Sequence, residues 1–255
     1  MSIEHSFIKG EKGMIEPSQA FEKAPIHFHT IILTFSHKII AALLREKKIT
    51  KIKDYYLGSV NGRIHAYQIN GTPFGLVMTL VGAAMTSGII EEMSWLFSAS
   101  NIILFGSAGV FDKSITQGKI IVPSEAYRDE GVSYHYMEPT DYISIPNSDY
   151  IYKTFMKMNV DCLLGKTWTT DAFYRETETE MKQHQKEGCL CVEMEISAAQ
   201  AVCNYRKLNF YPFVYGADVV STNSWDKRIL GNLKLDKRLA YYYLALELAK
   251  EIEKR

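Results

Sequence analysis

The chain has 255 residues, of which 47% are hydrophobic and 23% are charged, proportions that are ordinary for a globular protein. Basic and acidic residues number 29 each, so the formal net charge is +0. This balance argues against a role at nucleic acids or membrane surfaces that depends on bulk charge. No apolar run approaches the roughly 20 residues that a membrane-spanning helix requires.

The cysteines and the N-terminus indicate the compartment. Cys189 and Cys191 form one Cys-x-Cys pair, and no second pair completes a zinc set with Cys162 or Cys203. We therefore expect buried reduced thiols, no metal and a cytoplasmic protein. The polar start of the chain predicts no signal peptide, and residues 1–24 are expected to form an irregular arm.

Apolar runs and helical patterns alternate along the chain. The first half predicts strands over 31–35, 75–80 and 101–105, helices over 39–46 and 89–97, and a hairpin turn at Asn61-Gly62 within 55–70. The second half predicts strands over 119–123, 189–191 and 213–220, a strand end near 167, and helices over 147–160 and 235–254. Because no linker or low-complexity stretch interrupts this alternation, the sequence predicts one α/β domain over residues 1–255.

The stretch Val192–Ala199 places two carboxylates, Glu193 and Glu195, where a strand leads into a helix. Acids near a helix N-terminus gain from the helix dipole and from free backbone N–H groups. One interpretation is that at least one of them accepts hydrogen bonds from a polyhydroxy ligand. The other is that both face water at an ordinary helix start, and spacing alone favours this second interpretation.

Three further segments carry groups suited to a binding site. The strand over 101–105 ends in Gly106-Ser107-Ala108-Gly109, whose glycines allow close approach of backbone N–H groups to a ligand. Asp218 lies on an otherwise apolar strand, and burial there would raise its pKa. The polar and aromatic segment 127–136 predicts either a site or an interface.

Taken together, these segments resemble the nucleoside phosphorylase/nucleosidase superfamily. Four segments carry the resemblance in the family's order: Phe105–Gly109, Asp171-Ala172-Phe173-Tyr174, Val192-Glu193-Met194-Glu195 and Ala217-Asp218. The resemblance extends from about Ile31 to Arg228 and implies a mixed central β-sheet flanked by helices. It also implies cleavage of the bond between ribose C1′ and a nucleobase, through a transition state in which the sugar becomes cationic.

The resemblance assigns roles residue by residue. Asp218 is expected to be the general acid that protonates or hydrogen-bonds the departing base. Glu195, Met194 and Ser107 are expected at the ribose. Phe173, Gly109 and Glu193 are expected at the base side, with a purely structural role as the alternative for Glu193.

The phosphate end departs from the family pattern. Phosphorylases of this family place Gly-Asp-Pro and an arginine after the first strand, where this chain has residues 34–40 without them, and a second arginine where it has Leu104. The expected phosphate ligands are therefore Ser107, Gly106, Lys38, Arg128 and Arg175, or an arginine from a neighbouring subunit. The expected partners are a nucleoside and inorganic phosphate as co-substrate, with no other cofactor, in a homo-oligomer (a dimer or a trimer of dimers).

Two alternatives stay open beside a phosphorylase. A hydrolase on the same fold would not require the phosphate arginines, but it carries a water-activating glutamate near the first strand, and no acid lies between Thr34 and Ile40. A nucleoside-binding protein with weak activity is the third possibility. The base is also open, because Thr177 and Thr179 stand where uridine phosphorylases read uracil, while Asp218 favours a purine.

Overall fold

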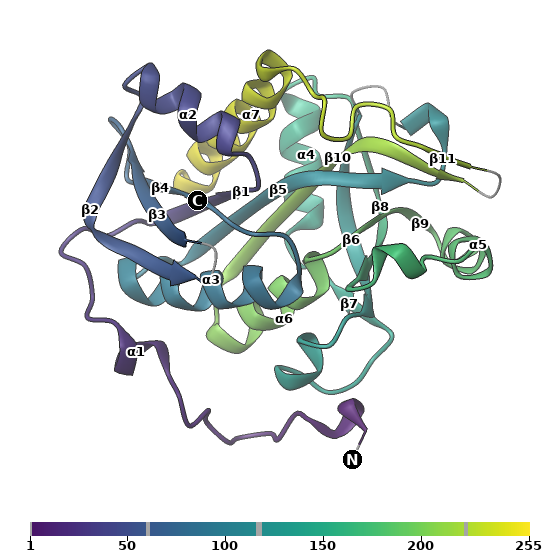
Figure 1. The fold of residues 1–255 in the computed structure, drawn as a ribbon, viewed down its shortest axis with the longest axis horizontal. Helices are drawn as coiled ribbons and strands as arrows, with labels where there is room; N and C mark the ends of the chain where they lie inside the picture. The colour runs from purple at the N-terminus through teal and green to yellow at the C-terminus, as the bar shows by residue number, and fades with distance from the viewer. Residues whose placement is uncertain (1, 60–61, 116–118, 222–223) are drawn as a thin grey trace.

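The computed structural model describes residues 2–59, 62–115, 119–221 and 224–255, and Figure 1 shows their arrangement. All strands belong to one mixed β-sheet that lies between two groups of helices. The predicted α/β class is therefore confirmed. Within the described ranges, none of the helices combines the length and the apolar character needed to cross a membrane.

The elements have the following bounds. The helices are α1 (Pro17–Ala20), α2 (His37–Arg45), α3 (Ala83–Phe97), α4 (Ser148–Lys157), α5 (Glu178–Lys186), α6 (Ile196–Arg206) and α7 (Leu235–Glu253). The strands are β1 (Thr30–Thr34), β2 (Ile49–Ser59), β3 (Gly62–Ile69), β4 (Phe74–Met78), β5 (Asn101–Val110), β6 (Ile120–Asp129), β7 (Tyr142–Ser144), β8 (Cys162–Thr170), β9 (Cys189–Glu193), β10 (Asn209–Ser221) and β11 (Ser224–Asp226).

The sheet is organised around β5. Its strand order is β11-β10-β6-β8-β9-β5-β1-β4-β3-β2, and an additional pairing joins β10 to β5. Strands β5, β10, β6, β8 and β9 therefore form a closed ring. Because β1, β5 and β10 run parallel, their carboxyl ends meet at one edge of the sheet. Ligands of α/β proteins commonly bind at such an edge.

Helices cover both faces of the sheet. Helices α3 and α6 pack on one face through buried side chains that include Met93, Phe97 and Val202. Helices α2, α4 and α7 pack on the other face, where Leu43 and Tyr242 belong to the second core cluster. Burial on both faces explains why β1 is a continuous buried run rather than an alternating one.

Several element bounds differ from the predicted ones. Strand β5 continues through Gly106–Val110, which was expected to be a loop, because this part pairs with both β9 and β10. Helix α3 begins six residues before the predicted start, and α5, β7 and β11 were not predicted. The Asn61-Gly62 turn lies partly outside the described residues, while β2 and β3 pair antiparallel with Ser59 opposite Gly62. All four cysteines are free and buried, as expected.

The N-terminal arm runs beneath α3 and α6 before it enters β1 (Figure 1). Among its described residues it contains a 3-10 turn at Ile3–His5 and the short helix α1, and it is otherwise largely irregular, as the sequence predicts. Arg206 on α6 pairs with Glu16 of the arm at 2.6 Å, and the Trp95 indole on α3 donates to the carbonyl of Phe21 at 2.9 Å. The arm is therefore tied to the two helices that it crosses.

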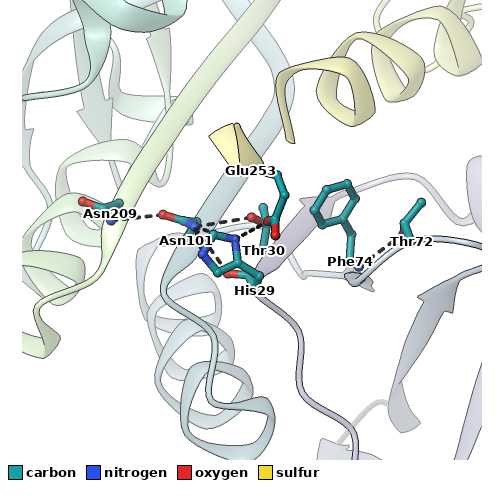
Figure 2. Close-up of polar contacts among 7 residues, drawn as sticks. All are labelled: His29, Thr30, Thr72, Phe74, Asn101, Asn209 and Glu253. Atoms are coloured by element: carbon teal, nitrogen blue, oxygen red, sulfur yellow. Dashed lines mark hydrogen bonds and ion pairs between the residues drawn. The ribbon is translucent and has the colours of Figure 1, made fainter. Parts of the chain in front are cut away.

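A polar chain joins the amino ends of the central strands, opposite the edge described above (Figure 2). Asn209 donates through Nδ2 to Asn101 Oδ1 at 3.0 Å, and Asn101 Nδ2 lies 3.3 Å from the ring of His29. His29 in turn pairs with Glu253 near the end of α7 at 2.5 Å. These contacts hold the last turn of α7 against β1, β5 and β10.

Candidate active site

Glu193 closes β9 and holds the start of α6. Its carboxylate accepts hydrogen bonds from the backbone N–H groups of Glu195 (2.7 Å) and Ile196 (2.8 Å) and from the hydroxyls of Thr169 and Thr167. Burial raises the pKa of Glu193, and these four donors oppose that effect. Because its oxygens are engaged by the protein itself, the geometry favours the structural role over the expected contact with the base.

Glu195 connects the β9–α6 junction to the turn before α3. Its Oε1 accepts from the backbone N–H of Gly82 at 2.7 Å, and its Oε2 accepts from that of Met194 at 3.3 Å. Glu195 is only 7% exposed, and burial together with the charge of Glu193 raises its pKa. Met194 stays partly exposed beside it. A buried carboxyl group and a partly exposed apolar side chain are therefore consecutive at the start of α6.

Asp218 lies on β10 just after an irregularity in the strand. The register with β5 shifts between Gly216 and Asp218, so that Asp218 pairs with Gly109. Such bulges redirect side chains near sites. The Trp225 indole donates to Asp218 Oδ2 at 2.7 Å. Burial raises the pKa of Asp218, and the indole contact lowers it, so the direction expected from the sequence is confirmed.

Gly109 is the point where these elements converge. It pairs with Val192 of β9 on one side and with Asp218 of β10 on the other. A methyl group on Gly109 would lie 2.8 Å from Val220 and 3.2 Å from Val192, so a larger residue does not fit there without movement. A glycine at this position lets β9 and β10 approach β5 closely, which brings the Glu195 and Asp218 segments together.

A cavity of about 190 Å³ adjoins the same strand two residues earlier. The hydroxyl-bearing residues Thr34, Ser36 and Ser107 line it, together with Gly106. The rest of the lining comes from Phe35, Ile39, Phe105, Tyr215, Ala217, Ile229, Leu230, Gly231, Leu233, Arg238 and Tyr241. Gly106 and Ser107, both predicted for the phosphate end, therefore share a cavity with Arg238.

Arg238 was not predicted as a site residue. It lies in the first turns of α7, where its Nε donates to the carbonyl of Leu233 at 2.9 Å and its Nη2 lies 3.5 Å from the carbonyl of Gly231. Its Nη1 has no hydrogen-bond partner within the part of the chain that the structure describes. No local motif marks Arg238, because a single arginine in a helix is ordinary in sequence.

The three cations predicted at the phosphate end do not line this cavity. Arg128 is 2% exposed and donates to Ser133 and to the carbonyl of Glu138, so its guanidinium serves the segment after β6. Lys38 and Arg175 are exposed, and neither lines the cavity. Among the described residues, no group of His, Cys, Asp or Glu is arranged to hold a metal ion.

The aromatic segment after β8 has an open face. Phe173 is 50% exposed, and its ring lies 4.0 Å from that of Tyr174. Glu176 follows in the same segment, and burial together with the charge of Asp218 raises its pKa to about 7. The charge interaction therefore places the Glu176 carboxyl group near Asp218, in the same segment as the exposed Phe173 ring.

Two relatives from the curated proteins match part of the chain. The chain is 25% identical over 150 residues to a DeoD-type purine nucleoside phosphorylase from Exiguobacterium sibiricum, covering 56% of this chain and 64% of that protein. It is 25% identical over 153 residues to a uridine phosphorylase from Haemophilus influenzae, covering 53% and 60%. The matches thus span about three fifths of these relatives.

Solved structures share the fold. An AMP nucleosidase from Bacteroides thetaiotaomicron matches with a TM-score of 0.66 at 17% identity, covering 90% of this chain and 91% of that one. A purine nucleoside phosphorylase from Toxoplasma gondii in complex with immucillin-H matches with a TM-score of 0.64 at 17% identity, covering 84% and 85%. The family model described as the phosphorylase superfamily matches residues 30–227. The chain therefore belongs to the phosphorylase superfamily.

Proposed function

We propose that this protein is a nucleoside phosphorylase, which cleaves the N-glycosidic bond of a nucleoside with phosphate to give free base and pentose 1-phosphate. The observation that carries the proposal is the convergence of Asp218 and the Glu195 segment at Gly109, two residues along β5 from the cavity at Ser107. Two strand residues span about 7 Å, a separation comparable with the width of a sugar ring.

In the proposed reaction, Asp218 donates a proton to the departing base, and Phe173 covers that base. Glu195 accepts hydrogen bonds from ribose hydroxyls, and its charge stabilises the positive charge that develops on the sugar. To do so, its carboxylate exchanges the present bond from Gly82 for one from the ribose. Met194 packs on the apolar side of the ring.

Phosphate is proposed to occupy the cavity beside Ser107. The Ser107 and Ser36 hydroxyls donate to its oxygens, and the Arg238 guanidinium compensates its charge. Arg238 would thereby replace the arginines that the family places after the first strand and before the glycine loop. It lies outside residues 30–227, which the family model covers.

Hydrolysis is the second candidate, because an AMP nucleosidase and a Campylobacter jejuni 5′-methylthioadenosine/S-adenosyl homocysteine nucleosidase share the fold. A nucleosidase requires a base that activates water. The residues that line the cavity include no Asp, Glu or His within the described chain, whereas they include Arg238. This lining favours phosphate over water as the nucleophile.

The decisive measurement is release of free base from a panel of purine and pyrimidine nucleosides with and without phosphate. Release that depends on phosphate supports the phosphorylase, and equal release without phosphate supports the hydrolase. Binding of a nucleoside without release would identify a nucleoside-binding protein.

A matched pair of variants tests the phosphate end. Arg238→Gln is expected to raise the KM for phosphate roughly tenfold or more, since a charge-assisted contact is lost, and to change the KM for nucleoside little. Lys237→Gln removes an exposed neighbouring charge and serves as the control. An unchanged phosphate KM in Arg238→Gln would contradict this assignment.

We further propose that the protein forms a homo-oligomer, a dimer or a trimer of dimers, as family resemblance implies. Light scattering after gel filtration tests this, and a monomer at the concentrations used for activity would contradict it.

A further inference from the structure

The carboxyl group of Asp218 is held by an indole at the protein surface. Trp225 lies on β11, where it pairs with Val220 near the end of β10. Its Nε1 donates to Asp218 Oδ2 at 2.7 Å. Asp218 is 7% exposed and Trp225 is 60% exposed. Among the side chains that the structure describes, this indole is the only donor to Asp218.

The contact makes the two oxygens of Asp218 unequal. An indole N–H donates and cannot accept, so it requires a lone pair on Oδ2. A carbonyl oxygen accepts better than an acid hydroxyl, and therefore the proton of the neutral carboxyl group belongs on Oδ1. Oδ1 lies on the side of β5, since a methyl group on Gly109 would be 3.6 Å from it.

We propose that Trp225 is a positioning residue that keeps the proton of Asp218 on Oδ1 and stabilises the carboxylate left after proton transfer. This inference rests on the proposed function, in which Asp218 is the acid. In the step, the O–H bond at Oδ1 breaks as the hydrogen bonds to a ring nitrogen of the base. The C1′–N bond breaks with its electron pair staying on the base, and phosphate bonds to C1′.

The hydrogen bond from Trp225 strengthens during this step. Before transfer the indole donates to a neutral acid, and afterwards it donates to a carboxylate, where such bonds are roughly twice as strong. The bond therefore favours the transition state over the bound substrate, which is the condition for raising kcat.

A comparison of pH–rate profiles is informative only if the other charged residues near Asp218 are the same in both proteins. The Glu176 carboxyl group interacts electrostatically with Asp218 from the segment after β8. Asp226 on β11 pairs with Arg228 at 3.0 Å. Substitution of Trp225 alone changes none of these charges, so a shift in the rate profile reports on the indole bond.

The first test compares Trp225→Phe, which removes the donor but keeps an aromatic ring, with Trp225→Gln, which keeps an N–H donor and adds no titratable charge. Trp225→Phe is expected to lower kcat roughly ten- to hundredfold with little change in the nucleoside KM. Asp218 acts in its protonated form, so the rate falls as pH rises through its pKa. Loss of the indole raises the pKa of Asp218, so the alkaline limb of the pH–rate profile, where kcat falls, should move up by about one pH unit.

A higher kcat in Trp225→Gln than in Trp225→Phe supports the positioning role. The proposal is overturned if Trp225→Phe leaves both kcat and the pH limb unchanged. It is equally overturned if kcat falls while the limb stays in place, because that result describes a purely structural residue.

A second measurement does not depend on turnover. The difference in tryptophan emission between the wild-type protein and Trp225→Phe isolates Trp225 from Trp95 and Trp168. This emission is expected to change with pH as Asp218 ionises, to lose that change in Asp218→Asn and to retain it in Glu176→Gln. Emission independent of pH would overturn the proposal. A protein that shows this titration but cleaves no nucleoside would overturn the proposed function while supporting the hydrogen bond.

Discussion

At the scale of single residues, the candidate site contains carboxyl groups of the same chemistry in different surroundings. Glu193 receives four hydrogen bonds from the protein, whereas Glu195 and Asp218 each retain capacity for a ligand. Burial raises the pKa of all three carboxyl groups, so the number of protein donors is what separates them. Glu193 is committed to the fold by its four donors, whereas Asp218 has one side-chain donor among the described residues and a raised pKa that suits proton transfer.

Asp218→Asn tests the acid directly. The amide keeps the shape of the side chain and removes the proton, so turnover is expected to fall about 10²–10⁴-fold. Nucleoside affinity, measured by calorimetry, should change by less than about threefold, because binding does not require the proton. Equal losses in turnover and affinity would contradict the role of the acid.

Glu176 makes stability depend on pH. Its pKa rises from 4.5 to about 7 on folding, because burial and the charge of Asp218 disfavour ionisation. Below the lower value Glu176 is protonated in both states. Between pH 4.5 and about 7 the unfolded chain has released this proton while the folded protein still holds it. The free energy of unfolding therefore falls as pH rises through this range.

Glu176→Gln should therefore be more stable than the wild type near pH 8, on the order of 2 kcal/mol, and equal to it near pH 4. Urea unfolding at both pH values measures this. Glu178→Gln, at an exposed position in the same segment, is the control. A stability gain that is the same at both pH values would contradict the assignment.

At the scale of elements, the hydroxyl of Thr169 on β8 links the end of β9 to the start of α6. It donates to Glu193 and accepts from the backbone N–H of Ser197 at 3.1 Å. One buried hydroxyl thus positions two elements that carry the ribose residues. Thr169 itself is fully buried, so water cannot replace a missing partner.

Thr169→Val is expected to lower the free energy of unfolding by about 2–3 kcal/mol, since it leaves two buried polar groups without this partner. Thermal unfolding measures the loss. Thr169→Ser retains the hydroxyl and should lose less. If the two variants lose equal stability, packing of the methyl group rather than the hydrogen bonds explains the effect.

At the scale of the whole molecule, Arg206 joins the N-terminal arm to the helical layer. Its guanidinium bonds both Glu16 in the arm and Glu91 on α3, and Glu91 is 8% exposed. Arm attachment and helix packing therefore depend on one side chain, although the two acids differ in burial.

Glu16→Gln should release the arm without unfolding the core. Limited trypsin digestion is expected to cut within residues 1–24 several times faster, while the melting temperature changes little, because partly exposed ion pairs contribute about 1 kcal/mol or less. Glu11→Gln is the control, since Glu11 is exposed and its carbonyl, which the substitution keeps, accepts from Tyr205 on α6. An arm as resistant to trypsin as that of the wild type in Glu16→Gln would contradict this view.

In contrast, Arg206→Met leaves Glu91 buried without its partner and should destabilise the core by about 3 kcal/mol.

The sequence by itself determined the alternation of strands and helices, because apolar periodicity is a local property of the chain. It also determined the order of the segments around Gly106, Phe173, Glu195 and Asp218, which sufficed for the family. The C-terminal end of β5 was predicted too early because its glycine-rich part has weak strand propensity. Only pairing with β9 and β10 makes this part a strand.

Only the tertiary structure decided which side chains meet. Arg128 was predicted as a phosphate ligand from the sequence, but it is buried and donates its hydrogen bonds to Ser133 and Glu138. Arg238 lies 131 residues after Ser107 in the chain, yet both residues line one cavity. Trp225 likewise matters because it meets Asp218 on the neighbouring strand. Glu193 matters because it accepts from the backbone N–H groups at the start of α6. The physical reason is that hydrogen bonds and burial depend on strand register and helix packing, which join residues distant in the chain.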